Sequence, residues 1–180
     1  MTDKSSLRAE CLRSRKSRDA TAIAAARDAV RRVVLDRCTA DGWTSVAGYV
    51  PLRTEPGSVE LLDDLVGRGV RVITPVLLDD KDLDWQEWRV GGSSRLGVGA
   101  VAAVDAVLVP ALAVAADGTR LGRGGGSYDR ALARVPAGTT IAALLFEGET
   151  VAALPAEAWD VPVNAIATPA GWESRGADQG

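Results

Sequence analysis

The sequence predicts an α/β fold: a three-layer open, mainly parallel sheet with helices on both faces. Two observations predict this fold. Short apolar runs, typical of strands that are buried on both faces, alternate with helical stretches along the 180 residues. Gly and Pro punctuate these runs, and neither an internal repeat nor a linker divides the chain. We therefore expect a single domain over residues 1–170, followed by a flexible tail over residues 171–180.

Helices open the chain. Residues 1–38 are rich in Ala and Arg and contain neither Gly nor Pro, which favours helix. A break near residues 17–19 separates a predicted helix over residues 5–16 from a longer one over residues 21–37. A third helix is predicted over residues 58–66, with Ser58 as its N-cap.

Strands follow wherever a short apolar or β-branched run is closed by turn residues. The predicted strands span residues 44–50, 70–78, 83–90, 106–109, 140–146 and 163–168. A Gly-rich loop over residues 116–126 leads into a fourth helix over residues 127–135. In open parallel sheets, ligands bind beyond the carboxyl ends of the strands, so we expect the site around this loop.

Composition excludes several classes of function. The chain has no His, which rules out His-dependent nucleophile systems and His-ligated metals, and its two cysteines, Cys11 and Cys38, are expected to be free thiols. The net charge of −3 argues against a nucleic-acid binder. The apolar stretch over residues 100–116 is shorter than the roughly 20 residues that a membrane-spanning helix needs, and Asp105 and Pro110 interrupt it. We expect a cytoplasmic protein that contacts no membrane.

The Gly-rich loop has the chemistry of an anion site. Four of the five residues from Gly122 to Gly126 are glycines, so that successive N–H groups can converge on an anion. Arg123 adds a cation suited to phosphate, and the following helix directs its N-terminus to the same place. Asp129 lies where a carboxylate could hold Mg²⁺ against the phosphates. The structural alternative is a flexible surface turn, with Asp129 only complementing the helix dipole.

This segment resembles the signature of the 5-formyltetrahydrofolate cyclo-ligase family, a pattern close to RLG-x-G-x-G-[YF]-Y-D-R after a strand that ends in Val-Pro. Three further motifs of that family occur in the same order along the chain. They are K-x-x-L-R at residues 4–8, Y-x-P-x-x-x-E at residues 49–55, and P-x-E-x-x-D-x-P-V at residues 155–163. The ordered set covers most of the chain. It departs from the family at Ser127, usually aromatic, at Trp159, usually His, and in the shortened stretch between Trp88 and Ala106.

The resemblance implies an ATP- and Mg²⁺-dependent ligase that converts 5-formyltetrahydrofolate to 5,10-methenyltetrahydrofolate, with a reduced folate as substrate and a monomer as the active form. It implies catalytic roles for Arg123 and Asp129, and Mg²⁺ ligation by Asp129 and Asp160. The ATP contacts that it implies come from Lys4, Ser5, Ser6, Leu7, Arg8, Arg120, Leu121, Gly122, Arg123, Gly124, Gly125, Gly126, Ser127 and Tyr128. The substrate contacts that it implies come from Val50, Glu55, Arg123, Gly124, Gly125, Gly126 and Ser127. The family varies at the middle glycine of the loop, so Gly125 is expected to accept Lys.

Several of these residues also have an explanation that involves no ligand. The Lys4 and Arg8 pair has the spacing of a solvated helix face, and Glu55 that of a solvated loop carboxylate. Trp85 and Trp88 could form a wall for a pterin ring, although the alternation of residues 83–90 explains them more simply as strand packing. At the level of function, a different ATP-dependent enzyme on the same scaffold, or a catalytically weakened folate- or nucleotide-binding paralogue, would share the same loop.

Overall fold

A mainly parallel sheet forms the centre of the molecule. The structure is a computed structural model that describes residues 3–88 and 94–175. The strands of the main sheet are β1 (Ser45–Ala47), β2 (Arg71–Leu77), β3 (Leu83–Glu87), β4 (Ala106–Pro110), β7 (Thr140–Leu144), β9 (Ala165–Thr168) and β10 (Gly171–Ser174). Within the described residues their order is β10-β9-β7-β4-β1-β2-β3. The inner strands pair in parallel, and β3 and β10 pair antiparallel at the two edges.

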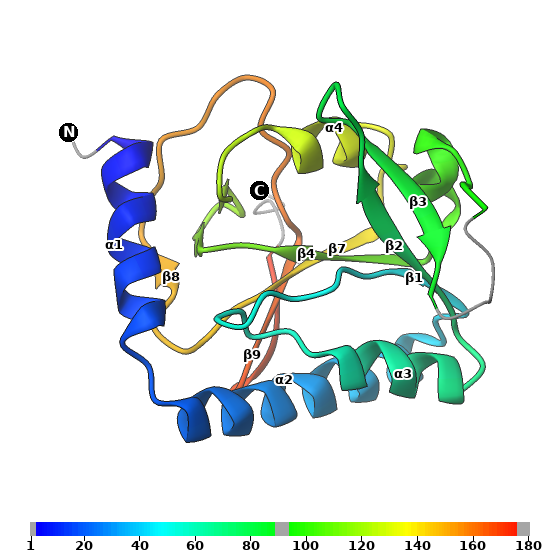
Figure 1. Cartoon of the computed structure of the whole chain (residues 1–180), viewed down its shortest axis with the longest axis horizontal. Helices are drawn as coiled ribbons and strands as arrows, with labels where there is room; N and C mark the ends of the chain where they lie inside the picture. Colours follow the sequence, from blue (N-terminus) through cyan, green and yellow to red (C-terminus); the bar gives the residue numbers. More distant parts are fainter. Residues whose placement is uncertain (1–2, 89–93, 176–180) are drawn as a thin grey trace, which may run out of the picture.

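Helices cover both faces of this sheet (Figure 1). On one face, α2 (Ala20–Asp41) and α3 (Val59–Gly67) share an apolar cluster with Val46 and Leu108 of the strands. On the other face, the 3-10 helix η1 (Val98–Ala103) and α4 (Ser127–Leu132) share a second cluster with Ala47 and Val107. Neighbouring residues of one strand thus pack on opposite faces, as burial on both sides requires. The predicted fold class is confirmed.

Capping residues fix the ends of the helices. Asp3 precedes α1 (Lys4–Lys16) and accepts a hydrogen bond from the Ser6 amide, while Asp19 accepts from the first amides of α2. Gly42 ends α2 in the left-handed conformation, with φ of 66°. The expected break at residues 17–19 is confirmed, and so is Ser58 as N-cap of α3, since its side chain accepts from the Leu61 amide.

A small second sheet attaches α1 to the main body. Its strands β5 (Ala113–Ala115), β6 (Arg120–Leu121) and β8 (Thr150–Val151) pair in the order β6-β5-β8. The sequence does not predict it, because strands of two or three residues are shorter than any recognisable pattern. The apolar face of α1 packs on an apolar cluster around this sheet, which contains Leu7, Cys11, Leu12, Leu112, Ala113, Leu121 and Leu154. This packing brings the start of the chain beside the Gly-rich loop.

The C-terminal residues differ in part from the tail that the sequence predicts. The flexible tail expected over residues 171–180 is wrong for residues 171–174, which form β10. Trp172 explains the difference, because its ring packs on Trp43, at 5.9 Å between ring centroids, and under the guanidinium of Arg37. Residues 176–180 of that tail, and residues 89–90 of the predicted third strand, lie outside the described residues.

The apolar stretch over residues 100–116 is divided among η1, β4 and β5, as expected for a buried strand with its approach and exit. No helix in the described ranges is long and apolar enough to cross a membrane. Both cysteines are free thiols, as predicted.

The strand order reverses between β1 and β4. The chain runs from β1 outward to β2, then returns to β4 on the other side of β1 and continues to β7 and β9. At such a reversal the loops at the carboxyl ends of the two central strands leave in opposite directions and open a crevice. The segments that follow β1 and β4 therefore border the expected position of a ligand.

Candidate active site

A cavity of about 500 Å³ lies at this reversal of strand order. Its volume falls within the range of small-molecule sites, which is roughly 300–1,000 Å³. Side chains and backbone from α1, from the loops after β1 and β4, from the ends of β2 and β3, and from the segment before β9 line it. The lining residues are Lys4, Arg8, Arg15, Glu55, Leu77, Leu83, Pro110, Ala111, Leu112, Arg120, Gly122, Arg123, Gly124, Gly125, Gly126, Ser127, Tyr128, Asp129, Glu157, Trp159 and Asp160. A second hollow, of about 440 Å³ beside the start of α2, contains none of the predicted site residues.

The Gly-rich loop adopts a backbone that glycine alone takes easily. Gly124, Gly125 and Gly126 have φ values of 96°, 114° and 71°. Gly126 then acts as N-cap of α4, which has only six residues, so the loop itself must supply most of the backbone N–H groups offered to an anion. The φ of Gly125 is one that side chains rarely adopt, so Lys would strain the backbone there, and its acceptance stays a prediction.

Cations from two elements converge on the loop. The Arg8 Nε donates to the Gly122 carbonyl at 2.9 Å, so α1 touches the loop directly. Arg120 comes from β6, donates to the Pro110 carbonyl at 3.1 Å and lies over the ring of Tyr128. These guanidinium groups are thus held in place by the protein's own carbonyls and ring.

Lys4 and the two predicted metal ligands form a second cluster beside the loop. The Lys4 Nζ donates to Asp160 Oδ2 at 2.6 Å, and Arg120 donates to Asp129 Oδ1 at 3.3 Å. The Val161 amide also donates to Asp129 Oδ1, at 3.3 Å. Because Val161 follows Asp160 directly, this bond links the segments that carry the two carboxylates. Burial raises the pKa of Asp160, but hydrogen bonds from Lys4 and the Glu157 amide outweigh it, so the net pKa lies below the ordinary value.

These two carboxylates fit Mg²⁺. In the described part of the chain no three acidic or thiol side chains gather as a metal site, and the two predicted carboxylates, Asp129 and Asp160, both border the cavity. Mg²⁺ is commonly held by one or two carboxylates together with waters and substrate phosphates. Both carboxylates border the cavity together with the Gly-rich loop, where such phosphates would lie.

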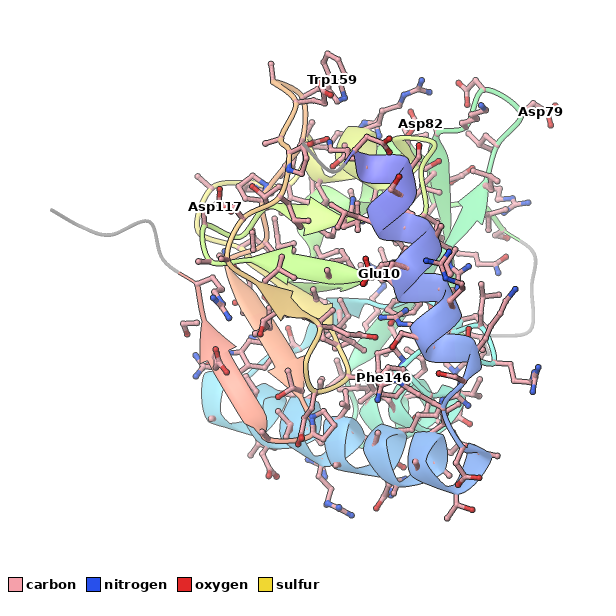
Figure 2. The ribbon with its side chains drawn as sticks, turned by 90° about the vertical axis from the view of Figure 1, so that its left-hand side faces the viewer. Glu10, Asp79, Asp82, Asp117, Phe146 and Trp159 are labelled. Carbon is pink, nitrogen blue, oxygen red and sulfur yellow. The ribbon has the colours of Figure 1, made fainter. Side chains whose placement is uncertain are left out.

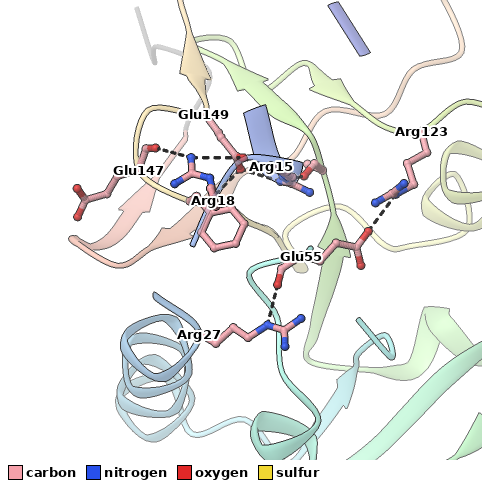
Figure 3. Close-up of polar contacts among 9 residues, drawn as sticks. Arg15, Arg18, Arg27, Glu55, Arg123, Glu147 and Glu149 are labelled. Carbon is pink, nitrogen blue, oxygen red and sulfur yellow. Dashed lines mark hydrogen bonds and ion pairs between the residues drawn. The ribbon is translucent and has the colours of Figure 1, made fainter. Parts of the chain in front are cut away.

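Glu55 is a buried residue that borders the cavity and pairs with Arg123 (Figure 3). Its side chain is 4% exposed; Oε1 accepts from Arg123 Nε at 3.1 Å, and Oε2 accepts from the Leu52 amide at 2.8 Å. Arg27 donates to the Glu55 carbonyl at 2.9 Å and to the Leu52 carbonyl at 2.8 Å, which fixes the loop after β1. The alternative of a solvated loop carboxylate is therefore wrong for Glu55.

Two tyrosines with buried hydroxyl groups interact electrostatically with Glu55. Burial, followed by the charge of Glu55, raises the pKa of Tyr49 far above its ordinary value. Burial also raises the pKa of Tyr128, against the opposing charge of Arg120. Both phenols are thus neutral in the physiological range and are not acid–base groups there.

Arg15 is a site residue that sequence reasoning missed. It is 1% exposed, and its Nε and Nη2 donate to the two carboxylate oxygens of Glu149 at 2.8 and 2.7 Å (Figure 3). Nη2 also donates to the Ala111 carbonyl at 2.6 Å. Burial lowers the pKa of Arg15, but the hydrogen bond and charge of Glu149 outweigh it and leave the pKa raised. The signal was available, because Lys4, Arg8 and Arg15 lie on one helical face.

The structure brings most of the predicted site residues together at the cavity and places five of them elsewhere. Arg8, Arg120, Glu55 and the loop over residues 122–129 are brought together at the cavity, and so are Lys4 and Asp160. Five others do not line it: Ser5, Ser6, Leu7, Leu121 and Val50. The Ser6 amide bonds to the cap of α1, and Leu7 and Leu121 pack in the apolar cluster beneath it. Val50 is 51% exposed, so it is neither a core residue nor a cavity residue.

Trp85 and Trp88 pack as strand residues, and a third tryptophan borders the cavity. Trp85 is completely buried, and Trp88 packs against the core while donating from Nε1 to Asp63, so strand packing explains both. Neither borders the cavity. Trp159 lies at the cavity rim and is 69% exposed (Figure 2).

Comparison with known proteins gives concordant results. The model of the 5-formyltetrahydrofolate cyclo-ligase family matches residues 1–169. A 5-formyltetrahydrofolate cyclo-ligase of Mycolicibacterium smegmatis is 36% identical, over 71% of this chain and 79% of that protein.

Solved structures share the fold. A 5,10-methenyltetrahydrofolate synthetase from Mycoplasma pneumoniae superimposes with a TM-score of 0.81 at 20% identity, covering 93% of this chain and 99% of that one. A 5,10-methenyltetrahydrofolate synthetase from Aquifex aeolicus superimposes with a TM-score of 0.77 at 23% identity, covering 98% of this chain and 95% of that one.

Proposed function

The chain belongs to the 5-formyltetrahydrofolate cyclo-ligase family, and from this premise we propose that it uses ATP and Mg²⁺ to convert 5-formyltetrahydrofolate to 5,10-methenyltetrahydrofolate, releasing ADP and phosphate. The observation that carries the proposal is the composition of one cavity. A positive-φ glycine loop, cations from α1 and β6, a pair of carboxylates and the buried Glu55 all border it. Action as a cytoplasmic monomer stays a prediction.

The polyphosphate would lie against the Gly-rich loop. The loop offers backbone N–H groups, while Lys4, Arg8 and Arg120 provide positive charge at its edges. Arg8 and Arg120 are already oriented by the Gly122 and Pro110 carbonyls, so little side-chain ordering remains when a phosphate binds. Asp129 and Asp160 would hold Mg²⁺, which neutralises phosphate charge when bound.

The reduced folate would enter from the side of Glu55. The Glu55 carboxylate is a hydrogen-bond acceptor for the N–H groups of a pterin, and it holds Arg123 at the junction with the loop. Arg123 is 39% exposed, so its guanidinium can reach an oxygen of either substrate. Val50 and Ser127 stay predicted substrate contacts.

The chemistry needs orientation and charge rather than a titrating base. The formyl oxygen attacks the γ-phosphorus, and the bond to ADP breaks. The N10 nitrogen then attacks the activated formyl carbon and gives up its proton to water, while the carbon–oxygen bond breaks and phosphate leaves. Arg120 and Arg123 both border the cavity and would stabilise the negative charge that develops on oxygen, which suits a chain without His.

A direct assay tests this function. Protein, Mg-ATP and 5-formyltetrahydrofolate are mixed, and the near-ultraviolet absorbance of the methenyl product is followed together with phosphate release. We expect both signals to rise in equal amounts. Phosphate release only with other acceptors would identify another ATP-dependent enzyme, and tight ADP binding without methenyl product would identify a binding paralogue.

Asp129→Asn should abolish most of this activity while leaving the fold intact. Asn keeps an oxygen for the Val161 amide, so stability should change by less than about 1 kcal/mol. It removes the charge that would hold Mg²⁺, and kcat should fall by roughly 100-fold or more. Full turnover at ordinary Mg²⁺ concentration would show that Asp129 is not the metal ligand.

A further inference from the structure

Trp159 is an aromatic ring exposed at the edge of a charged cavity. It is 69% exposed, although tryptophan is highly buried on average, and it lies at the end of the molecule that carries the first turn of α1 (Figure 2). Neither the strands nor the apolar clusters include it. We propose that Trp159 binds the nucleotide base by stacking and so determines nucleotide specificity, an inference that rests on the proposed use of ATP.

The order of contacts along the cavity places Trp159 on the nucleotide side. Glu55 bonds to Arg123, and the loop that carries Arg123 is contacted in turn by Arg8. Lys4, one helical turn before Arg8, bonds to Asp160, the neighbour of Trp159. Glu55, on the proposed folate side, and Trp159 thus lie at opposite ends of this series of contacts, with the Gly-rich loop between them.

This order fits the geometry of phosphoryl transfer. The γ-phosphate must meet the formyl oxygen on the side of Glu55, so the rest of the nucleotide extends away from it. That direction leads past Lys4 and Asp160 to the rim, where the indole of Trp159 is available. Glu55 is 4% exposed and Trp159 is 69% exposed, so the series also runs from the interior to the surface.

Trp159 is held in place although its ring is exposed. The following Asp160 accepts from Lys4 Nζ at 2.6 Å and from the Glu157 amide at 2.9 Å. The Val161 amide donates to Asp129 at 3.3 Å, next to the loop. The backbone on the C-terminal side of Trp159 is therefore tied to both α1 and α4.

Trp159 is also the more exposed of the aromatic residues at the cavity. Among the described residues that line the cavity, the aromatic side chains are Tyr128 and Trp159. Arg120 lies over the Tyr128 ring, at 5.6 Å from its centroid, and the Tyr128 hydroxyl is buried. Nucleobases stack on aromatic side chains through their π-faces, and an exposed indole offers such a face.

Equilibrium binding with and without a base tests the proposal. Titration calorimetry measures Mg-ATP, Mg-ADP and inorganic tripolyphosphate against the wild type, Trp159→Ala and Trp159→Phe. We expect Trp159→Ala to weaken ATP and ADP by about tenfold, the order of magnitude that stacking on one base supplies. Tripolyphosphate, which has no base, should bind equally to all three, and Trp159→Phe should retain most of the ATP affinity.

Leu77→Ala serves as the matched control. Leu77 is also apolar, exposed (65%) and at the same cavity, but it comes from the end of β2. It should leave ATP affinity unchanged, so an equal loss in this variant would overturn the assignment to Trp159. Unchanged ATP affinity in Trp159→Ala, or a loss confined to the reduced folate, would overturn it as well. In those cases methenyl product formation by the wild type would leave the proposed function standing, whereas a wild type that binds neither ATP nor tripolyphosphate would remove both.

Discussion

Charged side chains of the cavity have protein partners before a ligand binds. Lys4 bonds to Asp160, Arg120 to Asp129 and Arg123 to Glu55, at 2.6, 3.3 and 3.1 Å. A phosphate or a pterin that enters therefore exchanges partners with groups that are already oriented, and the cost of ordering them is paid in folding. Each residue acquires its role from such a partner rather than from its type alone.

Asp105 is a residue whose charge acts on stability rather than on the site. Its Oδ2 accepts from the amides and hydroxyls of Thr44 and Ser45, which joins the start of β4 to the start of β1. The hydrogen bond from the Thr44 amide is the main cause that holds its pKa below the ordinary value, against partial burial. A depressed pKa stabilises the fold at pH values above the unfolded pKa, and this contribution is lost as the pH falls through the folded pKa.

Asp105→Ala should therefore destabilise the protein in a pH-dependent way. At pH 7 we expect a loss on the order of 1 kcal/mol in the free energy of unfolding, because the site is exposed and screened. The difference from wild type should shrink as the pH falls below about 4, the range of an unperturbed Asp. Urea unfolding at several pH values measures it, and a difference that stays constant with pH would contradict the assignment.

At the scale of elements, α1 is joined to the rest of the molecule by polar contacts as well as by its apolar face. Lys4, Arg8 and Arg15 lie on one face and bond to three different segments: Asp160, the Gly122 carbonyl, and Glu149 with the Ala111 carbonyl. The Arg15 pair fixes the C-terminal half of α1, which in turn positions the two cations of the first half. We therefore expect Arg15 to act as a positioning residue for the proposed phosphate site.

Arg15→Ala should leave Glu149 buried without its main partner. We expect a loss of roughly 3 to 5 kcal/mol in the free energy of unfolding, reduced to the extent that Arg18, 3.9 Å from Glu149, replaces it. The double variant Arg15→Met with Glu149→Leu should recover much of this stability, because no uncompensated charge remains. Urea unfolding measures both, and a double variant that is less stable than Arg15→Ala would contradict the account.

We expect substitutions in the Gly-rich loop to lower stability, because side chains disfavour its backbone conformation. Gly125 has φ of 114°, and no heavy atom lies within 4 Å of the place that a Cβ would take, so conformation alone sets the cost there. We expect Gly125→Lys to lose on the order of 1 kcal/mol or more of stability. Gly126 has φ of 71° and ψ of 6°, a region that Asn visits, so Gly126→Asn should lose less than Gly126→Ala. Thermal unfolding ranks the three, and equal stability of all variants and wild type would indicate a loop that relaxes freely.

At the scale of the whole molecule, the cavity joins segments that are far apart in the sequence. α1, the loop after β1, the loop after β4 and the segment over residues 157–160 all contribute. The reversal of strand order between β1 and β4 brings the two loops together, and the small sheet carries α1 to them. A ligand in this cavity therefore binds the folded chain and has no equivalent site in the unfolded one.

Mg-ADP should accordingly raise the melting temperature. At a free concentration about 100 times its Kd, the added stability is about 2.7 kcal/mol, which for a chain of this size is roughly 5 to 10 °C. AMP, which lacks the second phosphate, should shift it far less. Differential scanning calorimetry measures both, and equal shifts by AMP and ADP would show that the phosphate loop contributes little to binding.

The sequence by itself determined the fold class, the order of most elements and the composition of the Gly-rich loop. These are local properties: apolar periods define strands buried on both faces, Ser58 defines a helix start, and four glycines in a row of five define a loop that can surround an anion. Lys4 and Arg8 were found through the K-x-x-L-R motif, which is also local, and the helical face that they share would have included Arg15.

Only the tertiary structure decided which residues meet. The Arg15–Glu149 pair joins positions 134 residues apart, and no local pattern carries that information. The two- and three-residue strands of the small sheet exist because neighbouring segments supply their hydrogen-bond partners, and β10 forms because Trp172 finds Trp43 to pack on. The partner of Arg123 and the exposed rim position of Trp159 depend in the same way on the path of the chain in space, since contact energies are set by distance and not by sequence separation.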